Sequence, residues 1–533
     1  MVNTEQELSS INVTRNTTCA PNSSTISSNN AAEQNLTEKP FTHPSTSYFR
    51  IQNLQQTYNL CDKIHVVIQA MDQFKRNKTE GGDYFRAKMY TTGLLASGTT
   101  DGKIVDYNNG SYSAFFTLRW SGKIAINVML INSREAIEAM NRVRNVKPTR
   151  FVYDGTFVAE KLKKVVRCHV ELPSSKHTCD YTDKRTGEPW FCEKPSNMPC
   201  SAYSYHRGNT HLGGRETRAV FKPTESRLFR DNNAIENPCF VVVMNINLLC
   251  FRYGKKSTGV KKIYVNESNE QTLCIESSSE CRRNNKFKVE RKLAAGFYFK
   301  DKWYSNECTL KNITVQLALS SGCLKHKRLY FFGDSTIRQW YEYFVSKVEN
   351  TTSQKYTAGA TWYTGPLYAN STKNNMTFFF RIHAYPIRAR TMRVDDIKYT
   401  ANEIDDIIAD QNTIIFVCLF AHFEATSLQV YSRRLKTIKN ALLRLYQRSP
   451  KTIVFMKSAN TRSYGGAVGA VNVGDWLAMQ FDGEMRKMMA DIPNLYIIDV
   501  WDMTNNHRVG DNIHPPQIII TEYIRIVLSL ICT

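Results

Sequence analysis

A serine that follows an apolar run, and an aspartate and a histidine near the C-terminus, are the residues of this chain best suited to acyl-transfer chemistry. Residues 333–335 read Gly-Asp-Ser and follow the apolar run 329–332, while Asp511 and His514 lie three positions apart. A serine hydroxyl becomes a strong nucleophile when an imidazole removes its proton and a carboxylate orients that imidazole. The residue types predict Ser335 as nucleophile, His514 as base and Asp511 as orienting acid.

An alternative interpretation is that Asp334 or Ser335 only caps a helix, since both are ordinary N-cap residues. If Ser335 begins a helix, the unpaired backbone N–H groups of the first turn would also stabilise an oxyanion. Other candidates for oxyanion or substrate contacts are Gly333, Asp334, Arg338, His422 and Asn460. For the last three, a surface cation, a structural histidine and a turn asparagine are the competing interpretations.

The elements that must position these residues alternate between strands and helices from residue 326 to 533. Strands are predicted at 328–332, 378–382, 413–420, 452–457 and 495–500, and helices at 336–348, 401–410, 428–446, 476–490 and after 516. This alternation predicts an open parallel sheet with helices on both faces. The candidate residues follow strand ends, where such sheets bind ligands.

The preceding residues divide into three further segments. Residues 1–56 are rich in Ser, Thr and Asn and predict a flexible glycosylated stem. Residues 57–165 show strand patterns, and 110–120 with 123–129 predict a hairpin that resembles the end of an immunoglobulin-like sandwich of the filamin kind. Residues 166–325 are expected to form a Cys-rich connector.

Cysteines and glycosylation sequons indicate an oxidising compartment. Ten of the 14 cysteines lie between Cys168 and Cys323, and none forms a Cys-X-X-Cys pair, so disulfides are favoured over a metal site. The eleven Asn-X-Ser/Thr sequons begin at Asn12, Asn16, Asn22, Asn35, Asn77, Asn109, Asn266, Asn312, Asn350, Asn370 and Asn375. We expect a glycoprotein of the secretory pathway, in the Golgi lumen or secreted.

Neither a targeting segment nor a membrane span is visible in the sequence. The N-terminal residues MVNTEQELSS have no basic and apolar signal pattern, and the apolar stretch 239–251 is too short to span a bilayer. A net charge of +22 favours anionic partners. Because the basic residues are scattered and no nucleic-acid motif accompanies them, acidic glycans are expected rather than DNA or RNA, with a basic surface without partner as the alternative.

The Gly-Asp-Ser run and the C-terminal Asp-X-X-His resemble the SGNH (GDSL-like) superfamily, specifically its PC-esterase branch. Residues 333–339, Gly-Asp-Ser-Thr-Ile-Arg-Gln, are similar to a segment of sialate O-acetyltransferases. From about residue 57 onwards the chain resembles the neurexophilin and PC-esterase domain (NXPE) family. This resemblance implies a neurexophilin-like β domain, a Cys-rich connector and a three-layer α/β/α PC-esterase domain at 326–533. It assigns the nucleophile to Ser335, the base to His514 and the orienting acid to Asp511.

Three functions remain open at this point. The resemblance favours a glycan O-acetyltransferase that acts on sialic acid or another sugar hydroxyl through an acetylated Ser335, with acetyl-CoA as acyl donor and no metal. A secreted carbohydrate esterase would use the same acyl-enzyme and differ only in that water takes the acyl group. A secreted ligand that binds a cell-surface receptor through its β domain, without catalysis, is the third possibility.

Overall fold

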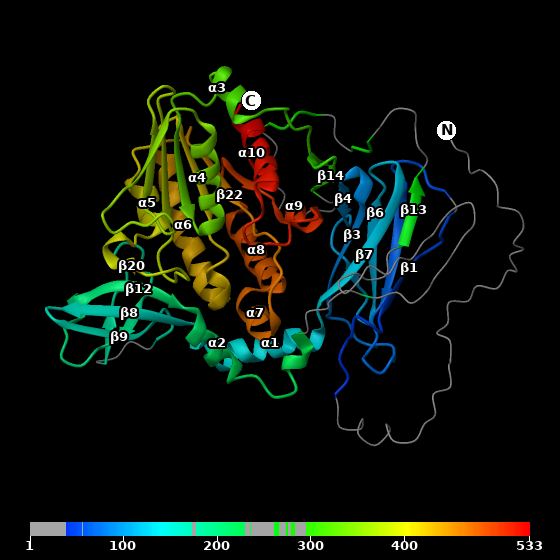
Figure 1. Cartoon of the computed structure of the whole chain (residues 1–533), viewed down its shortest axis with the longest axis horizontal. Helices are drawn as coiled ribbons and strands as arrows, with labels where there is room; N and C mark the ends of the chain where they lie inside the picture. The colour runs from blue at the N-terminus through cyan, green and yellow to red at the C-terminus, as the bar shows by residue number, and fades with distance from the viewer. Residues whose placement is uncertain are drawn as a thin grey trace, which may run out of the picture.

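The structure is a computed structural model of the whole chain, and Figure 1 shows the arrangement of its elements. It describes residues 39–55, 57–172, 177–229, 235, 261–265, 273–275, 279–282 and 295–532. Most of the predicted stem and much of the predicted connector therefore lie outside the described residues.

Two antiparallel sheets form the first unit and share one hydrophobic core. The first has the order β1-β2-β6-β5, with β1 Tyr48–Ile51, β2 Lys63–Gln69, β6 Ser111–Thr117 and β5 Val105–Asp106. The second has the order β13-β7-β3-β4-β14-β15, with β13 Lys261–Val265, β7 Gly122–Asn132, β3 Tyr84–Thr91, β4 Ala96–Thr99, β14 Gly296–Phe299 and β15 Lys302–Ser305. Alternate residues of both sheets, such as Val66, Phe116 and Ile126, are fully buried between them.

The predicted hairpin of residues 110–129 is wrong. Strand β6 pairs with β2 and β5, whereas β7 pairs with β3 and β13 in the other sheet. Both strands point alternate apolar side chains into the same core, so they have the alternation of a hairpin without being paired to each other.

The unit also has different boundaries from those predicted. It gains β1 from the predicted stem and β13, β14 and β15 from the predicted connector. The disulfide Cys61–Cys274 links the predicted sandwich segment to the predicted connector. A helix, α1 Arg134–Val146, lies within the segment expected to be all β. The Ser133 side chain caps it by accepting a hydrogen bond from Ala136 N, which is a local signal for a helix start. The immunoglobulin-like assignment stays a prediction.

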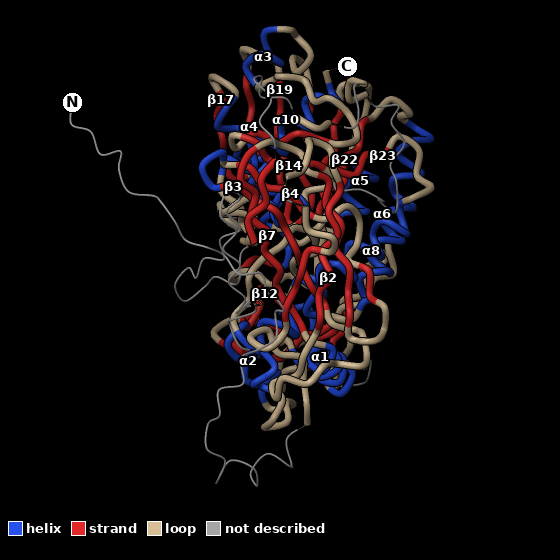
Figure 2. Tube along the Cα trace, turned by 90° about the vertical axis from the view of Figure 1, so that its right-hand side faces the viewer, coloured by secondary structure: helices blue, strands red, loops and turns tan. Residues whose placement is uncertain are grey.

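A third sheet packs against the C-terminal domain and shares a hydrophobic core with it. Its order is β10-β11-β9-β8-β12-β20, with β10 Thr178–Asp180, β11 Phe191–Glu193, β9 Leu162–His169, β8 Val152–Ala159, β12 Tyr203–Asn209 and β20 Met392–Arg393. Disulfides Cys168–Cys192 and Cys179–Cys200 hold its strands. Strand β20 comes from the C-terminal domain, so the sheet is built by both parts of the chain. Helix α2 Thr210–Arg218 follows β12, and it lies with α1 at one end of the molecule (Figures 1 and 2).

The C-terminal domain is built on a seven-stranded sheet. Its order is β17-β18-β19-β16-β21-β22-β23, with β17 Thr351–Lys355, β18 Leu367–Ser371, β19 Met376–Ile382, β16 Arg328–Gly333, β21 Thr413–Cys418, β22 Ile453–Lys457 and β23 Leu495–Ile498. Strands β19, β16, β21, β22 and β23 are parallel to one another, and β17 and β18 form an antiparallel edge. This parallel core agrees with the alternation read from the sequence.

Helices cover both faces of this sheet. Its helices are α3 Val315–Ser320, α4 Ser335–Lys347, α5 Thr400–Asp406, α6 Leu428–Arg448, α7 Gly466–Val473, α8 Asp475–Met489, α9 Trp501–Asn506 and α10 Gln517–Ile531. Alternation along β16 places Phe331 in one core with α4 and α10, and Phe332 in the opposite core with α6 and α8. The SGNH-like layering stays a prediction, because the order of layers alone does not identify that superfamily.

Five disulfides and the sequon side chains agree with a protein of the secretory pathway. Disulfides Cys281–Cys308 and Cys323–Cys532 complete the five, and Cys418 is a buried free cysteine. Of the six sequon asparagines that the structure describes, five are exposed: Asn77, Asn109, Asn312, Asn350 and Asn375. Among the residues that the structure describes, no helix is both long and apolar enough to cross a membrane.

Candidate active site

The turn between β16 and α4 requires glycine at position 333. Gly333 has a φ of +150°, and a Cβ at this position would lie 1.8 Å from the carbonyl oxygen of Cys418 on the neighbouring strand β21. Only glycine allows the two strands to remain this close while the chain turns sharply into the helix. Gly333 therefore shapes the turn that presents Ser335.

Asp334 caps helix α4 and is completely buried. One carboxylate oxygen accepts hydrogen bonds from Thr336 N at 2.9 Å and Thr336 Oγ1 at 2.7 Å, and the other accepts one from Ala421 N at 3.1 Å. These contacts hold the first turn of α4 against the end of strand β21. Asp334 therefore orients the turn that carries Ser335, and its oxygens are occupied by the protein itself.

Ser335 and His514 are brought together from positions 179 residues apart in the sequence. Ser335 Oγ lies 2.7 Å from His514 Nε2, which is hydrogen-bonding distance. Ser335 is the first residue of α4, and its backbone N–H has no acceptor among the described residues. The carbonyl oxygen of an acyl group attached to Ser335 Oγ would therefore meet a free N–H donor and the positive end of the helix dipole.

The loop that carries His514 is fixed by hydrogen bonds to its backbone. His514 N donates to Asn512 Oδ1 at 3.0 Å, and Asn460 Nδ2 donates to the carbonyl oxygen of Asn512 at 3.1 Å. From helix α4, Gln339 Nε2 donates to the carbonyl oxygen of Pro515 at 3.1 Å. The loop is thereby attached both to β22 and to α4.

Asn460, expected as an oxyanion or substrate residue, is instead engaged within the protein. It is completely buried, its amide group donates to backbone carbonyls, and its Oδ1 accepts a hydrogen bond from Lys457 Nζ at 2.9 Å. Each of its polar atoms is therefore paired. Its position makes it a support for the loop before His514.

Asp511 contacts an arginine of the first unit. Its carboxylate oxygens accept hydrogen bonds from Arg86 at 3.2 and 3.1 Å, and Arg86 also pairs with Asp475 at 2.6 Å. None of the hydrogen bonds among the described residues joins Asp511 to His514. The expected Asp511–His514 contact is not formed, and the role of Asp511 as orienting acid stays a prediction.

Arg86 and Lys88 also set the charge of Asp511. Partial burial acts to raise the pKa of the Asp511 carboxyl, but the Arg86 guanidinium and Lys88 outweigh it, so that pKa lies below its ordinary value. Full burial raises the pKa of Asp475 despite the attraction of Arg86. Asp511 is thus held as a carboxylate by cations of strand β3.

His514 has the protonation state required of a base. Desolvation lowers the pKa of His514 below its ordinary value, Asp334 opposes this, and Arg338 lowers it further. At neutral pH the imidazole is therefore uncharged, and Nε2 is able to accept the proton of Ser335 Oγ. Of the candidate residues, Ser335 and His514 form the contact that proton transfer requires.

A second pair of histidines lies beside the turn. His383 follows the end of β19. The Nε2 atom of His383 lies 2.9 Å from Nδ1 of His422, and the Nδ1 atom of His383 lies 2.6 Å from the carbonyl oxygen of Ala384. Because a carbonyl only accepts, His383 Nδ1 carries the hydrogen, and His383 Nε2 then accepts from His422 Nδ1–H. His422 Nε2 is left with a lone pair and has no hydrogen bond among the described residues.

Burial keeps both of these rings uncharged. Burial and the positive charges of Arg388 and Arg462 lower the pKa of His422 to about 3. Burial also lowers the pKa of His383. The free lone pair of His422 is therefore a fixed hydrogen-bond acceptor, and the ring lies close enough to His514 for its charge to lower the pKa of His422. This is compatible with a substrate contact from a hydroxyl group.

Arg338 lies one turn into α4 from Ser335. Its side chain donates a hydrogen bond to the carbonyl oxygen of Tyr363, pairs with Glu342 at 3.0 Å and lies 5.7 Å from the Tyr363 ring. It links the nucleophile helix to the loop between β17 and β18. Its guanidinium is thus engaged by the protein and lies close enough to His514 to affect its pKa.

Three residues that support the site were missed in the sequence: Arg86, His383 and Gln339. Gln339 is part of the Gly-Asp-Ser-Thr-Ile-Arg-Gln run, and its spacing of four from Ser335 places it on the same helix face. His383 follows a predicted strand, as the other candidates do. Arg86 had no such signal, because it lies in the other unit, 425 residues from Asp511.

Two protein-family models match different parts of the chain. Residues 303–532 match the family described as NXPE family member 4-like, C-terminal domain, and this match includes Ser335, Asp511 and His514. Residues 23–215 match the family described as Neurexophilin, which includes Arg86. The two matches lie in the order expected for a neurexophilin-like part followed by a PC-esterase-like part. The protein belongs to the neurexophilin and PC-esterase domain (NXPE) family.

Proposed function

We propose that this protein is a serine-dependent O-acetyltransferase that modifies a sugar hydroxyl of a glycan, with sialic acid as the acceptor. The observation that carries the proposal is the 2.7 Å contact between Ser335 Oγ and His514 Nε2 at the start of α4. The membership of the NXPE family and the disulfide-bonded fold support a substrate in the secretory pathway. The acyl donor is acetyl-CoA, and no metal takes part.

The first half-reaction forms an acetyl ester on Ser335. His514 Nε2 removes the proton of Ser335 Oγ, and Oγ attacks the thioester carbonyl. The backbone N–H of Ser335 stabilises the negative charge on the carbonyl oxygen. The C–S bond then breaks, and His514 returns the proton to the departing thiolate, which leaves as the free thiol.

The second half-reaction uses the same groups in the opposite direction. His514 removes the proton of the sugar hydroxyl, the hydroxyl oxygen attacks the Ser335 ester, and the proton returns to Ser335 Oγ as the new ester leaves. The unpaired His422 Nε2 accepts a hydrogen bond from a second hydroxyl of the acceptor and so fixes its orientation. The acetyl group ends on the glycan and the enzyme is regenerated.

A fluorophosphonate probe and an acetyl-transfer assay test the proposal together. The full-length protein is expected to be labelled at Ser335 and to transfer acetyl from acetyl-CoA to a sialoside, and both reactions are expected to be lost in Ser335→Ala and His514→Ala. Ser346→Ala is a suitable control, because Ser346 is exposed near the C-terminal end of α4 and its hydroxyl bonds only to the Tyr343 carbonyl oxygen. A Ser335→Ala protein that still acetylates the sialoside would contradict the proposal.

A carbohydrate esterase is the alternative that a specific observation favours. His514 is exposed, so water reaches the position from which the sugar hydroxyl would attack. Release of acetate from an acetylated sialoside in the absence of any donor, without transfer when acetyl-CoA is added, would assign this function.

Non-catalytic binding to a cell-surface receptor through the neurexophilin-like part is the remaining candidate. The match of residues 23–215 supports it. In that case folded protein would show neither labelling of Ser335 nor acetyl transfer, and it would bind cells through the first unit.

A further inference from the structure

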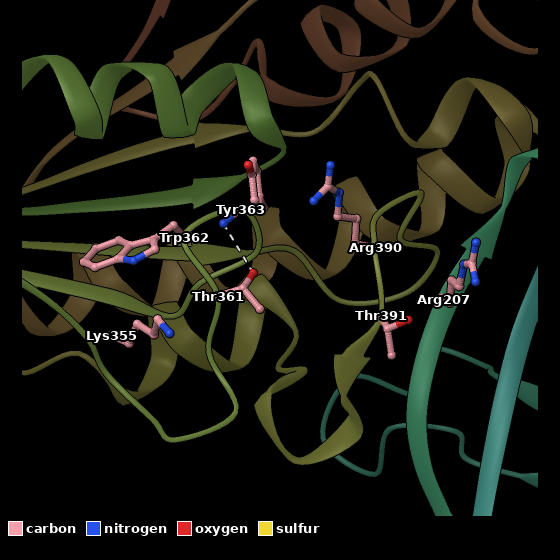
Figure 3. A pocket seen from close by; sticks show the side chains of 7 residues that line it. All are labelled: Arg207, Lys355, Thr361, Trp362, Tyr363, Arg390 and Thr391. Carbon is pink, nitrogen blue, oxygen red and sulfur yellow. Dashed lines mark hydrogen bonds between the residues drawn. The ribbon is translucent and has the colours of Figure 1, made fainter.

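A pocket of about 570 Å³ lies next to the nucleophile helix and is lined by cationic and aromatic side chains. The seven lining residues are Arg207, Lys355, Thr361, Trp362, Tyr363, Arg390 and Thr391. Figure 3 shows Tyr363 and Arg390 in the middle, with Trp362 and Lys355 on one side and Arg207 on the other. Its volume is within the range of pockets that bind small organic ligands, about 300–1,000 Å³.

The charge of the pocket is uncompensated. Arg207, Lys355 and Arg390 form no ion pair with the described residues, and none of the seven lining residues is acidic. Other arginines nearby are paired, as Arg393 is with Asp395 at 2.9 Å. Three cations without acidic partners around one cavity favour a negatively charged ligand.

Arg390 combines a cation–π contact with available hydrogen-bond donors. Its guanidinium carbon lies 4.6 Å from the centre of the Tyr363 ring. Its N–H groups have no hydrogen-bond acceptor among the described residues, and a guanidinium can donate two parallel hydrogen bonds to a carboxylate. The rigid ring reduces the entropy that Arg390 loses on binding.

The aromatic side chains are unusually exposed. Trp362 and Tyr363 line the pocket, and their exposed fractions are 49% and 55%. Large aromatic rings that remain open to solvent beside a cavity favour a ligand with apolar faces of its own. The C–H faces of pyranose rings have this property.

The pocket is connected to the nucleophile through Arg338. Arg338 lies three residues after Ser335 on α4, hence on the same side of the helix, and it donates a hydrogen bond to the carbonyl oxygen of Tyr363. A ligand in the pocket therefore lies next to helix α4, which Ser335 begins. The acyl group and the pocket ligand would meet at the start of α4.

An acidic sugar explains these features better than the phosphates of an acyl donor. Nucleotide phosphates are typically bound by backbone N–H groups at a helix N-terminus or in a glycine-rich loop. All seven lining residues lie on strands β12 and β17 or in the loops before β18 and β20, and none is at a helix N-terminus. Side-chain cations with open aromatic rings suit a carboxylate on a sugar.

We propose that this pocket binds the carboxylated sugar of the acyl acceptor, with Arg390 pairing its carboxylate and Trp362 and Tyr363 packing against its ring. The inference rests on the proposed function, since it assigns the acceptor of that reaction to a site. Lys355 and Arg207, at the two ends, contact neighbouring acidic groups of a longer glycan.

Binding is tested first with the full chain carrying Ser335→Ala, which removes turnover. Sialyllactose and lactose are titrated and the dissociation constants are measured by calorimetry or NMR. Sialyllactose is expected to bind more tightly than lactose. Arg390→Gln is expected to raise the dissociation constant for sialyllactose about ten- to hundred-fold, as for a lost charge-assisted hydrogen-bond pair. Arg433→Gln removes the same charge at an exposed position of α6 outside the pocket and is expected to change neither constant.

Equal affinities for the two sugars, or an Arg390→Gln protein that binds sialyllactose as its parent does, would overturn the assignment. Because Ser335→Ala protein is used, this result does not depend on whether the enzyme transfers acetyl groups. In protein with Ser335 intact, Arg390→Gln is expected to raise the KM for the sialoside and leave the KM for acetyl-CoA unchanged. A change in the KM for acetyl-CoA alone would assign the pocket to the donor and reject the proposal.

Discussion

Arg86 of strand β3 donates hydrogen bonds to both carboxylate oxygens of Asp511, three residues before His514. The same guanidinium pairs with the buried Asp475 at the start of α8. Arg86 lies in the neurexophilin-like part of the chain, whereas the two aspartates lie in the C-terminal domain. The first unit therefore holds the loop that carries the proposed base.

Removing this arginine is expected to destabilise the protein. Arg86→Ala leaves Asp475, with a side chain only 2% exposed, as a buried charge without its partner, a change that costs about 3–5 kcal/mol. Calorimetry should show a lower melting temperature for the transition that includes the C-terminal domain. Arg393→Ala, which breaks the exposed pair with Asp395, is the control and should leave the melting temperature unchanged. Similar melting temperatures for both variants would contradict a structural role of Arg86.

Asp511 and His514 are expected to differ in their effects on catalysis. His514→Ala removes the group that contacts Ser335 Oγ, and losses of about 10⁶-fold are known for a base in such a site. Asp511→Asn changes a side chain that pairs with Arg86, so the loss of kcat should be smaller by at least about ten-fold. Single-turnover acetylation of Ser335 measures both. Equal losses for the two variants would show that Asp511 acts directly on His514 during the reaction.

Asn460 is expected to act on kcat through the position of His514. Asn460→Ala removes the hydrogen bond to the Asn512 carbonyl and leaves Lys457 without its side-chain partner, and a buried group left unpaired costs about 1–3 kcal/mol. We expect a lower kcat with an unchanged KM for the acceptor, because Asn460 faces the loop and is closed to solvent. Asn440→Ala, on the exposed side of α6, serves as the control. A raised acceptor KM with normal kcat would instead make Asn460 a substrate residue.

The pH profile of acetyl transfer should report the charge around His514. Only uncharged His514 acts as the base, so activity rises as pH increases through its pKa, which lies below the ordinary value. Arg338 contributes to this lowering, so Arg338→Gln should raise the pKa of His514 and move the acid limb of kcat/KM to higher pH. Lys347→Gln removes a cation from the other end of α4 and should leave the limb in place. A limb that moves to lower pH in Arg338→Gln would reverse the assigned sign.

The sequence predicted those features of the C-terminal domain that depend on local pattern. The strands and helices predicted between residues 328 and 533 follow periodic apolar patterns, and they appear in the structure with shifts of a few residues, whereas β17, β18, α7 and α9 were not predicted. Ser335 and His514 were predicted together because parallel strands end at the same edge of a sheet, which brings distant loops into contact. The helix cap formed by Asp334 was one of the two interpretations considered for it, whereas the requirement for glycine at position 333 was not predicted.

What the sequence did not reveal depends on contacts between distant segments. Strands β6 and β7 have the pattern of a hairpin, but the partner of a strand is set by the whole core, and here they lie in opposite sheets. Strands β14 and β15 were not predicted, because the cysteines around them suggested a disulfide-bonded connector. The Arg86–Asp511 pair joins residues of ordinary surface type, so nothing in their local sequence indicates that they meet.

Gly333 offers the sharpest test of the turn that presents Ser335. The Cβ of Gly333→Ala would lie 1.8 Å from the Cys418 carbonyl oxygen, a backbone atom that can move only if strands β16 and β21 separate. We expect a loss of stability well above the ~1 kcal/mol typical of point substitutions, and loss of probe labelling at Ser335. Gly483→Ala is the matched control: Gly483 lies on the exposed side of α8 with open space around it, so alanine should stabilise the helix by about 0.5–1 kcal/mol. Alanine at position 333 would clash with the backbone, whereas alanine at position 483 only restricts the unfolded chain. Equal melting temperatures for the two variants would therefore mean that the turn is not held as the structure describes.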